Sequence, residues 1–397
     1  MFTLFPLFFL LALSVGENSV RFAAVIYRHG DRTPVSTYPT DPWQNESYWP
    51  VKFGELTNTG KRQHFALGRW LRKRYAHLLS ANFDPAEIYV RSTDVDRTIM
   101  SAQVSLAGMY PPKGQAVWNK DLNWQPVPVH IVPEKDDDVL AMNKKCPNYD
   151  KEYEKAIRSS EYKSQLSRFQ TLMNYLSAHT GMPIKNFADI NDIYSTLYIE
   201  SLYNFSLPNW TQSVFPNKMF EPACYSFVVP TMTPLLARLK IAPFLQQVIN
   251  SMMYIISNES LGTNFTQPRL AIYSGHDLTI GNILNSLGMF DGKCPPYTAT
   301  IFMELIKVKT GYVIRISYRN STKIVEPYVL IIPKCGKECP IERFNRLYRD
   351  FITLNWNLEC GNKPFPSVFG VSFFVVMILF FGVYFMQKIR VKGKTSG

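Results

Sequence analysis

Residues Val25 to Pro34 read Val-Ile-Tyr-Arg-His-Gly-Asp-Arg-Thr-Pro, and they combine the end of a predicted strand with a basic motif. The apolar run from Phe22 to Tyr27 predicts a buried strand, and Gly30 allows a sharp turn after it. Arg28 and Arg32 therefore lie at the carboxyl end of a strand, where open α/β sheets bind their ligands. A lone Arg-His-Gly could be an exposed basic turn, but two guanidiniums four positions apart suit a phosphate group.

Two histidines occupy similar places in the predicted core. His29 lies between the two arginines, whose charges disfavour the protonated imidazole, so the ring should stay neutral and nucleophilic. His276 follows a second apolar run, Leu270 to Tyr273, and precedes Asp277, which repeats the first layout. On these letters alone, His276 could also be a buried structural histidine.

The motif is longer than a basic turn requires. Arg-His-Gly-x-Arg-x-Pro at residues 28–34 resembles the signature of the histidine acid phosphatases, a branch of the histidine phosphatase superfamily that includes prostatic and lysosomal acid phosphatases and phytases. Three later segments fit the same pattern: Leu56-Thr57 with Gly60, Gln63-His64 and Leu67-Gly68; Arg91 to Thr98; and Tyr273 to Asp277. The resemblance covers roughly residues 20–360.

The resemblance implies a fold and a chemistry. The fold is α/β, with a phosphoglycerate-mutase-like core sheet flanked by helices and an inserted, mainly helical cap subdomain. His29 would attack phosphorus and form a phosphohistidine, and Asp277 would protonate the leaving oxygen. The phosphate would be bound by Arg28, Arg32, Arg97 and His276. Taken alone, Arg97 is an ordinary helix arginine. We expect no cofactor and no metal.

Other phosphatase chemistries fit the letters less well. No cysteine is followed six positions later by arginine, as a cysteine phosphatase requires. Asp94 to Thr98 resembles the nucleophile motif of haloacid dehalogenase phosphatases, but the companion lysine and acidic motifs are missing. Two alternatives stay open: a phytase-like phosphatase, and a membrane receptor that keeps the fold as a phosphate-binding module without turnover.

Both ends of the chain carry apolar segments. Residues 1–16 have no charged side chain and predict a signal peptide, with an uncleaved anchor as the alternative. Residues 364–387 are also uncharged and exceed the roughly 20 residues of a spanning helix, so they predict a transmembrane helix rather than a core helix or a removed anchor signal. The basic tail, residues 388–397, should be cytoplasmic, which makes residues 17–363 luminal or extracellular.

The predicted luminal domain divides by its secondary-structure pattern. An α/β core should comprise residues 20–149 and 262–360, and the helical cap about 150–261, with helices near Glu154–Ala178, Ile190–Tyr203 and Pro234–Ile256. A helix from about Lys61 to Leu79, capped by Thr57 or Thr59, should bury the stripe Leu67, Leu71, Tyr75 and Leu78. His64 on that helix reads as structural. A short strand over Glu87–Arg91 and a hairpin turning near Gly311 complete the core. The loop Asp41–Pro50 is placed at the pocket rim.

Glycosylation sites and cysteines fit a luminal domain. Six sequons lie between the two apolar ends, at Asn45, Asn204, Asn209, Asn258, Asn264 and Asn320. Six cysteines lie on the same side and favour disulfides, although counting alone leaves fifteen pairings open. The family resemblance implies Cys146 with Cys360, Cys224 with Cys294, and Cys335 with Cys339.

The net charge and the tail sequence limit the possible partners and locations. The formal charge is +12, of which four units come from the tail, leaving a mild bias towards anionic substrates and no case for nucleic acid. The substrate would be a phosphomonoester, and the resemblance implies a homodimer. The tail contains no tyrosine sorting signal, so lysosomal membrane and cell surface are both open.

Overall fold

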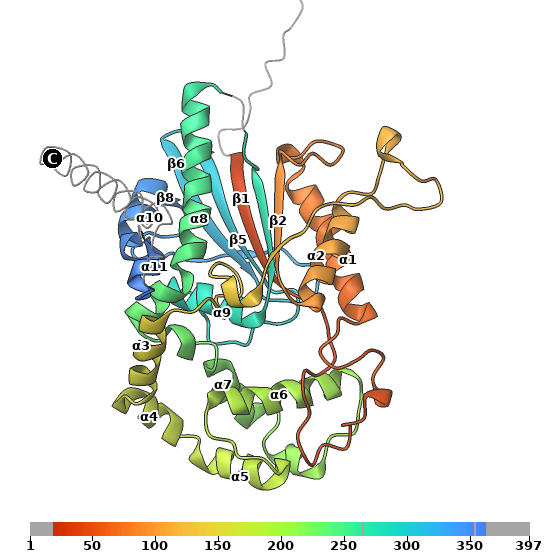
Figure 1. The fold of residues 1–397 in the computed structure, drawn as a ribbon, viewed down its shortest axis with the longest axis vertical. Helices are drawn as coiled ribbons and strands as arrows, with labels where there is room; N and C mark the ends of the chain where they lie inside the picture. The colour runs from red at the N-terminus through yellow and green to blue at the C-terminus, as the bar shows by residue number, and fades with distance from the viewer. Residues whose placement is uncertain (1–18, 264–265, 353–354, 363–397) are drawn as a thin grey trace, which may run out of the picture.

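The computed structural model describes residues 19–263, 266–352 and 355–362. Within these residues, eight strands form one mixed sheet in the order β3-β2-β4-β1-β5-β6-β7, with β8 paired to β6 (Figure 1). The strands are β1 (Ser19–Arg28), β2 (Ile88–Thr93), β3 (His130–Val132), β4 (Leu270–Gly275), β5 (Thr300–Val308), β6 (Gly311–Arg319), β7 (Tyr328–Val329) and β8 (Cys339–Pro340).

β1 lies in the middle of the sheet and is parallel to β4, which is in turn parallel to β2. Arg28 at the end of β1 is in register with Gly275 at the end of β4. Because carboxyl ends of parallel strands meet at one edge of a sheet, the residues that follow these strands converge. The predicted hairpin is confirmed: β5 and β6 are antiparallel and Val308 pairs with Gly311.

Both faces of β1 are buried, as its continuous apolar run predicts. Ala23, Val25 and Tyr27 pack against helices α1 (Asn58–Arg74) and α2 (Asp96–Met109). The alternate residues Phe22, Ala24 and Ile26 pack against the opposite layer, which contains α8 (Pro234–Leu261), α9 (Asp277–Ser286) and α10 (Ile341–Leu347). The strand that carries the basic motif is thus fixed from both sides (Figure 1).

Helix α1 confirms the predicted cap and the predicted buried stripe. The Thr57 side chain accepts a hydrogen bond from the Gly60 amide, and Leu67, Leu71, Tyr75 and Leu78 are all buried. The helix ends at Arg74, earlier than predicted, and Leu78 lies in a separate 3-10 turn. At this end, the Arg74 guanidinium and the Tyr75 hydroxyl both donate to the buried Glu304 carboxylate of β5.

Between β3 and β4 the chain is helical. The sequence pattern near Glu154–Ala178 corresponds to three short helices instead of one. Ser159 is the N-cap of the second helix, and Phe169 is the N-cap of the third. The helices here, besides α8, are α3 (Pro147–Ile157), α4 (Ser160–Ser167), α5 (Gln170–Thr180), α6 (Phe187–Leu202) and α7 (Asn217–Tyr225). Helices α5 to α7 lie beyond the lower edge of the sheet in Figure 1.

Short 3-10 turns complete the connections. They are η1 (Glu46–Tyr48), η2 (Ala76–Leu78), η3 (Gly114–Ala116), η4 (Glu134–Asp136), η5 (Asn209–Ser213), η6 (Val229–Thr231) and η7 (Arg349–Phe351).

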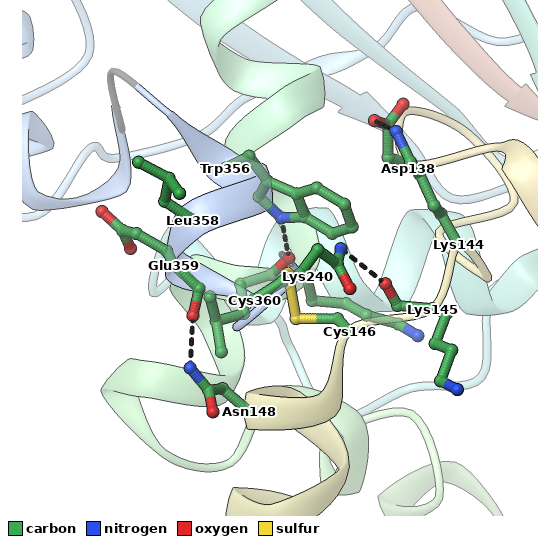
Figure 2. Close-up of a disulfide and its surroundings, with 12 residues drawn as sticks. Asp138, Lys144, Lys145, Cys146, Asn148, Lys240, Trp356, Leu358, Glu359 and Cys360 are labelled. Atoms are coloured by element: carbon green, nitrogen blue, oxygen red, sulfur yellow. Dashed lines mark hydrogen bonds and ion pairs between the residues drawn. A yellow bond between two sulfur atoms is a disulfide. The ribbon is translucent and has the colours of Figure 1, made fainter. Parts of the chain in front are cut away.

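Three disulfides form the pairs that the family resemblance implies: Cys146–Cys360, Cys224–Cys294 and Cys335–Cys339. Figure 2 shows the first, which ties helix α11 (Trp356–Glu359) to the start of α3. Beside it, the Trp356 indole donates to the Leu239 carbonyl at 2.8 Å and Asn148 donates to the Glu359 carbonyl at 2.7 Å. The late part of the described chain is therefore held against the helices that precede β4.

The predicted signal peptide and the predicted span at 364–387 lie outside the described residues. Inside them, no single helix has the length and hydropathy to cross a membrane; the stretches Asn217–Thr231 and Pro234–Leu261 reach that level only as a pair bent by 78°. Asn45, Asn204 and Asn209 are exposed, whereas Asn258 and Asn320 are half-buried. Asn264 lies outside the described residues.

Candidate functional site

The turn after β1 is built on a close backbone crossing. The His29 amide donates to the Gly275 carbonyl at 3.0 Å, which continues the pairing of β1 with β4. Gly30 then passes the amino end of α1, where an added Cβ would lie 2.6 Å from the Gly60 carbonyl oxygen. Only glycine fits such an approach, so this crossing fixes where the His29 side chain begins.

His29 is 1% exposed, and its ring has a defined tautomer. Nδ1 lies 2.8 Å from the Gly30 carbonyl oxygen, which can only accept a hydrogen bond. In a neutral ring, Nδ1 therefore carries the hydrogen and Nε2 keeps its lone pair. Burial, followed by the charges of Arg28 and Arg32, holds the pKa of His29 well below its usual range. The ring is therefore expected to stay neutral at a pH where a free imidazole is protonated.

Arg28 is held on three sides. Nη1 donates to the Pro295 carbonyl at 2.6 Å, Nη2 lies 2.8 Å from Asp277 Oδ2, and the guanidinium carbon lies 4.4 Å from the centre of the Tyr297 ring. Oδ1 of Asp277 also accepts the Leu278 amide at 2.8 Å. Burial raises the pKa of Asp277, but Arg28 and Arg32 outweigh it and leave that pKa below the usual value.

Arg32 and Arg97 lack the carboxylate partner that Arg28 has. Arg32 is 8% exposed and donates to the Thr33 carbonyl at 3.0 Å, and within the described ranges neither side chain has a carboxylate within 4.0 Å. Burial and the charge of Arg32 lower the pKa of Arg97 to about 10. Cations gathered without counter-charge are unfavourable unless an anion joins them, so this cluster is a site for an anion.

His276 closes the site from the β4 side. Its ring centre lies 5.6 Å from that of His29 in an edge-on arrangement, and its Nε2 lies 3.0 Å from Thr93 Oγ1. Its backbone amide donates to Thr279 Oγ1 at 3.2 Å, which sets the ring at the amino end of α9. Burial and Arg97 lower the pKa of His276 to about 4, against the opposing charge of Asp277.

A cavity of about 410 Å³ opens onto these groups. Arg28, Arg32 and Asp277 form its inner end, and one face of α6 forms the opposite wall. The remaining lining residues are Val35, Ser36, Asn191, Asp192, Tyr194, Ser195, Thr196, Tyr198, Phe220, Phe227, Cys294, Pro295, Pro296 and Tyr297. Of the six predicted site residues, Arg28, Arg32 and Asp277 thus line the cavity, whereas His29, Arg97 and His276 are not among its lining residues.

Comparison with known proteins identifies the family of the chain. Residues 19–319 match the family model of the histidine phosphatase superfamily (branch 2). The chain belongs to this superfamily. It is 36% identical to human prostatic acid phosphatase over 362 residues, covering 90% of the chain and 92% of the relative. It is 35% identical to Xenopus laevis lysosomal acid phosphatase, covering 88% and 80%. Human lysosomal acid phosphatase is 32% identical, covering 95% and 90%.

Solved structures of phytases share the fold of this superfamily member. Hafnia alvei phytase in complex with tartrate matches with a TM-score of 0.64 at 16% identity, covering 87% of the chain and 99% of the phytase. Citrobacter braakii phytase matches with a TM-score of 0.63 at 16% identity, covering 86% and 99%. Both have a central sheet flanked by helices, so the likeness supports the mixed α/β fold.

All six residues predicted for the phosphate site of this histidine phosphatase gather at one edge of the sheet. The helix over Ile190–Tyr203 was predicted as part of the cap, but the residues with which it lines the pocket were not, because α6 lies about 160 residues after His29 and its periodicity does not tell which face meets the site. The predicted rim, Asp41–Pro50, is wrong: it does not line the cavity. It packs against the end of α6 instead, where Trp43 stacks on Phe205 and Trp49 lies edge-on to Tyr203.

Three other histidines pack against aromatic rings outside the predicted site. His64 is fully buried with its ring 4.9 Å from that of Tyr27, and burial followed by Arg319 lowers its pKa to about 3. His130 stacks on Tyr89 and His179 stacks on Trp210. These contacts are those of structural residues.

Proposed function

We propose that this chain is an acid phosphatase that hydrolyses phosphomonoesters through a phosphohistidine on His29. The observation that carries the proposal is the state of His29. A neutral ring, with Nδ1 bonded to the Gly30 carbonyl, presents Nε2 beside three arginines, of which only Arg28 has a carboxylate partner. Such a cluster binds the phosphoryl oxygens and leaves the nucleophile unprotonated in acid, where a free imidazole would be protonated.

In the first step, Arg28, Arg32, Arg97 and His276 bind the phosphoryl oxygens. Nε2 of His29 attacks phosphorus, and the bond to the ester oxygen breaks with its electron pair on that oxygen. Asp277 gives the departing oxygen a proton, so a neutral alcohol leaves. In the second step a water oxygen attacks phosphorus, Asp277 takes the water proton, and the phosphorus–nitrogen pair returns to Nε2.

Asp277 needs a proton for the first step, and the substrate supplies the conditions for it. Without substrate, Arg28 lies 2.8 Å from the Asp277 carboxylate and keeps it ionised. A phosphate that binds the same guanidinium competes for its charge and adds a negative charge nearby, and both effects raise the pKa of Asp277. An acidic medium then keeps the carboxyl protonated, which fits the names of the acid phosphatase relatives.

The two alternatives make different demands. A binding module without turnover does not need Nε2 free or a carboxyl beside it, and this site has both. A phytase must receive several phosphates at once. The structural neighbours named phytases favour that alternative through their fold alone, at 16% identity.

Four finer features belong to the same proposal. Residues of about 150–261 form a cap whose helix α6 faces the site, within a luminal domain of residues 17–363. The chain is anchored once, through 364–387, in the lysosomal membrane or at the cell surface; relatives named lysosomal acid phosphatase support the former. The protein is a homodimer. The exposed side chains of Val117, Trp118, Leu122 and Trp124 form the candidate contact surface.

The test is hydrolysis of 4-nitrophenyl phosphate by the full-length chain, from acidic to neutral pH. The wild type should be most active in acid, and His29→Ala should be inactive. His77→Ala is the matched control, because His77 is exposed and distant from the cavity, and it should keep wild-type activity. Rapid alkaline quenching should trap labelled phosphate on histidine in the wild type. An active His29→Ala variant, or an inactive folded wild type, rejects the proposal.

A further inference from the structure

The cavity has an uneven distribution of charge. Apart from Arg28 and Arg32 at its inner end, no lysine, arginine or histidine lines it within the described part of the chain. On the α6 wall, the charged lining residue is Asp192, which is an exposed residue. Its carboxylate has no ion-pair partner within 4.0 Å among the described residues. Beyond the phosphate subsite, the wall is therefore negative.

Aromatic side chains line the same cavity. Tyr194 and Tyr198 lie one turn apart on α6 with nearly parallel rings whose centres are 6.2 Å apart. Phe220 of α7 lies edge-on to Tyr194 at 6.1 Å, and Phe227 lines the same cavity. Faces of aromatic rings attract cations, and a carboxylate beside them adds to that attraction.

The charges of the proposed reacting groups also affect the pKa of Asp192. Partial burial and the Asp189 carboxylate raise its pKa, Arg32 lowers it, and Asp277 raises it. Asp192 thus senses both the phosphate-binding charge and the proposed proton donor. A leaving group attached to a phosphate on Arg28 and Arg32 would occupy the cavity that α6 also lines.

We propose that the α6 wall, through the carboxylate of Asp192, is a leaving-group subsite that selects phosphomonoesters of cationic alcohols. This inference rests on the proposed phosphatase function. The bound phosphate neutralises the arginine cluster, so the charge that the rest of the substrate meets is that of Asp192 and the ring faces. A quaternary or primary ammonium is attracted there. A second phosphate meets a carboxylate and finds no further cationic donor, which disfavours polyphosphorylated substrates.

The test uses two substrates that differ in charge and hardly in shape: phosphocholine, and 3,3-dimethylbutyl phosphate, in which carbon replaces the charged nitrogen. Their kcat/KM values are compared with the full-length chain at about pH 6, above the usual carboxyl pKa. The wild type should prefer phosphocholine by roughly three- to tenfold, the size expected for a partly exposed charge contact with aromatic faces.

Asp192→Asn keeps the side-chain shape and removes the charge, so its ratio should fall to near one. Asp192→Glu should restore a preference for phosphocholine. Asp136→Asn is the control for total charge, because Asp136 is exposed and does not line the cavity, and its ratio should equal that of the wild type.

The outcomes separate the two proposals. Hydrolysis of both esters at equal kcat/KM by the wild type, or an unchanged ratio in Asp192→Asn, overturns the subsite and leaves the phosphatase standing. If Asp136→Asn loses the preference for phosphocholine as Asp192→Asn does, the preference depends on the total charge of the protein. That result also overturns the subsite. Failure of the wild type on 4-nitrophenyl phosphate and on both esters overturns the phosphatase and the subsite together.

Discussion

Gly60→Ala should damage catalysis although Gly60 is 31 residues from His29 and does not line the cavity. A Cβ at position 60 would lie 2.8 Å from the Asp31 amide nitrogen and closer still to the Asp31 carbonyl oxygen. Ordinary contact begins at about 3.4 Å, so the loop after β1 must move by more than about 0.6 Å. Asp31 is two residues from His29, and the displacement therefore reaches the nucleophile.

The substitution should reduce both the stability and the rate. Overpacking at a buried position costs about 1–3 kcal/mol of folding free energy. A misplacement approaching 1 Å at the nucleophile costs up to about a hundredfold in rate, so kcat should fall roughly ten- to a hundredfold. The assay is kcat for 4-nitrophenyl phosphate, measured well below the melting temperature of each variant.

Gly288→Ala provides the control for stability alone. Gly288 follows α9 with φ of +72°, where a Cβ is strained and would lie 3.2 Å from Pro333, away from the cavity. It should lower the melting temperature and keep kcat. A wild-type kcat in Gly60→Ala, or an equal loss of kcat in Gly288→Ala, would refute the link between the crossing and the nucleophile.

Three further predictions concern protons. Because burial and then Arg28 and Arg32 lower the pKa of His29 well below its usual range, kcat/KM for an aryl phosphate should not fall with a pKa near about 6.5 as the pH decreases. A pH–rate profile with such a limb contradicts this. Asp277→Asn should lower kcat far more for an alkyl phosphate, whose alkoxide needs a proton, than for 4-nitrophenyl phosphate. Equal losses would remove Asp277 from the role of proton donor. Burial and then Asp41 raise the pKa of Glu200 to about 9 from 4.5, so the folded state keeps a proton that the unfolded state releases between these values. Wild-type stability should therefore decrease as the pH rises through that range, and Glu200→Gln should flatten the dependence of the melting temperature on pH; an unchanged slope counts against it.

The residues at the sheet edge could be predicted from the sequence, because most of them directly follow a predicted strand. Arg28, His29 and Arg32 follow one apolar run, and His276 and Asp277 follow another. Parallel pairing of β1 with β4 then brings the two groups together, and the family pattern supplies Arg97. The predicted strand ends thus indicate which residues come together once the sheet forms.

The wall could not be predicted in the same way. Asp192 lies on a helix whose apolar periodicity predicts that one face is buried. The periodicity does not tell which distant part of the chain a given face meets. The Asp41–Pro50 segment shows the converse error, since closeness in sequence to Arg32 does not place it at the opening. Its aromatic residues pack against the end of α6, and Asp41 shares a buried environment with Glu200 there. Both facts depend on how distant elements dock.

The bond between Cys146 and Cys360 has a consequence for proteolysis. It closes a ring of chain over a sequence separation of 214, and this ring contains α6, His276 and Asp277, whereas Arg28 and His29 lie outside it. A protease that cuts the ring once, for instance at the exposed turn between α4 and α5, releases no fragment, because the new ends stay joined through sulfur. The nicked protein would separate into two pieces only after reduction. For an enzyme proposed to work among degradative hydrolases, a first cut would then leave both halves of the active site in one covalent molecule.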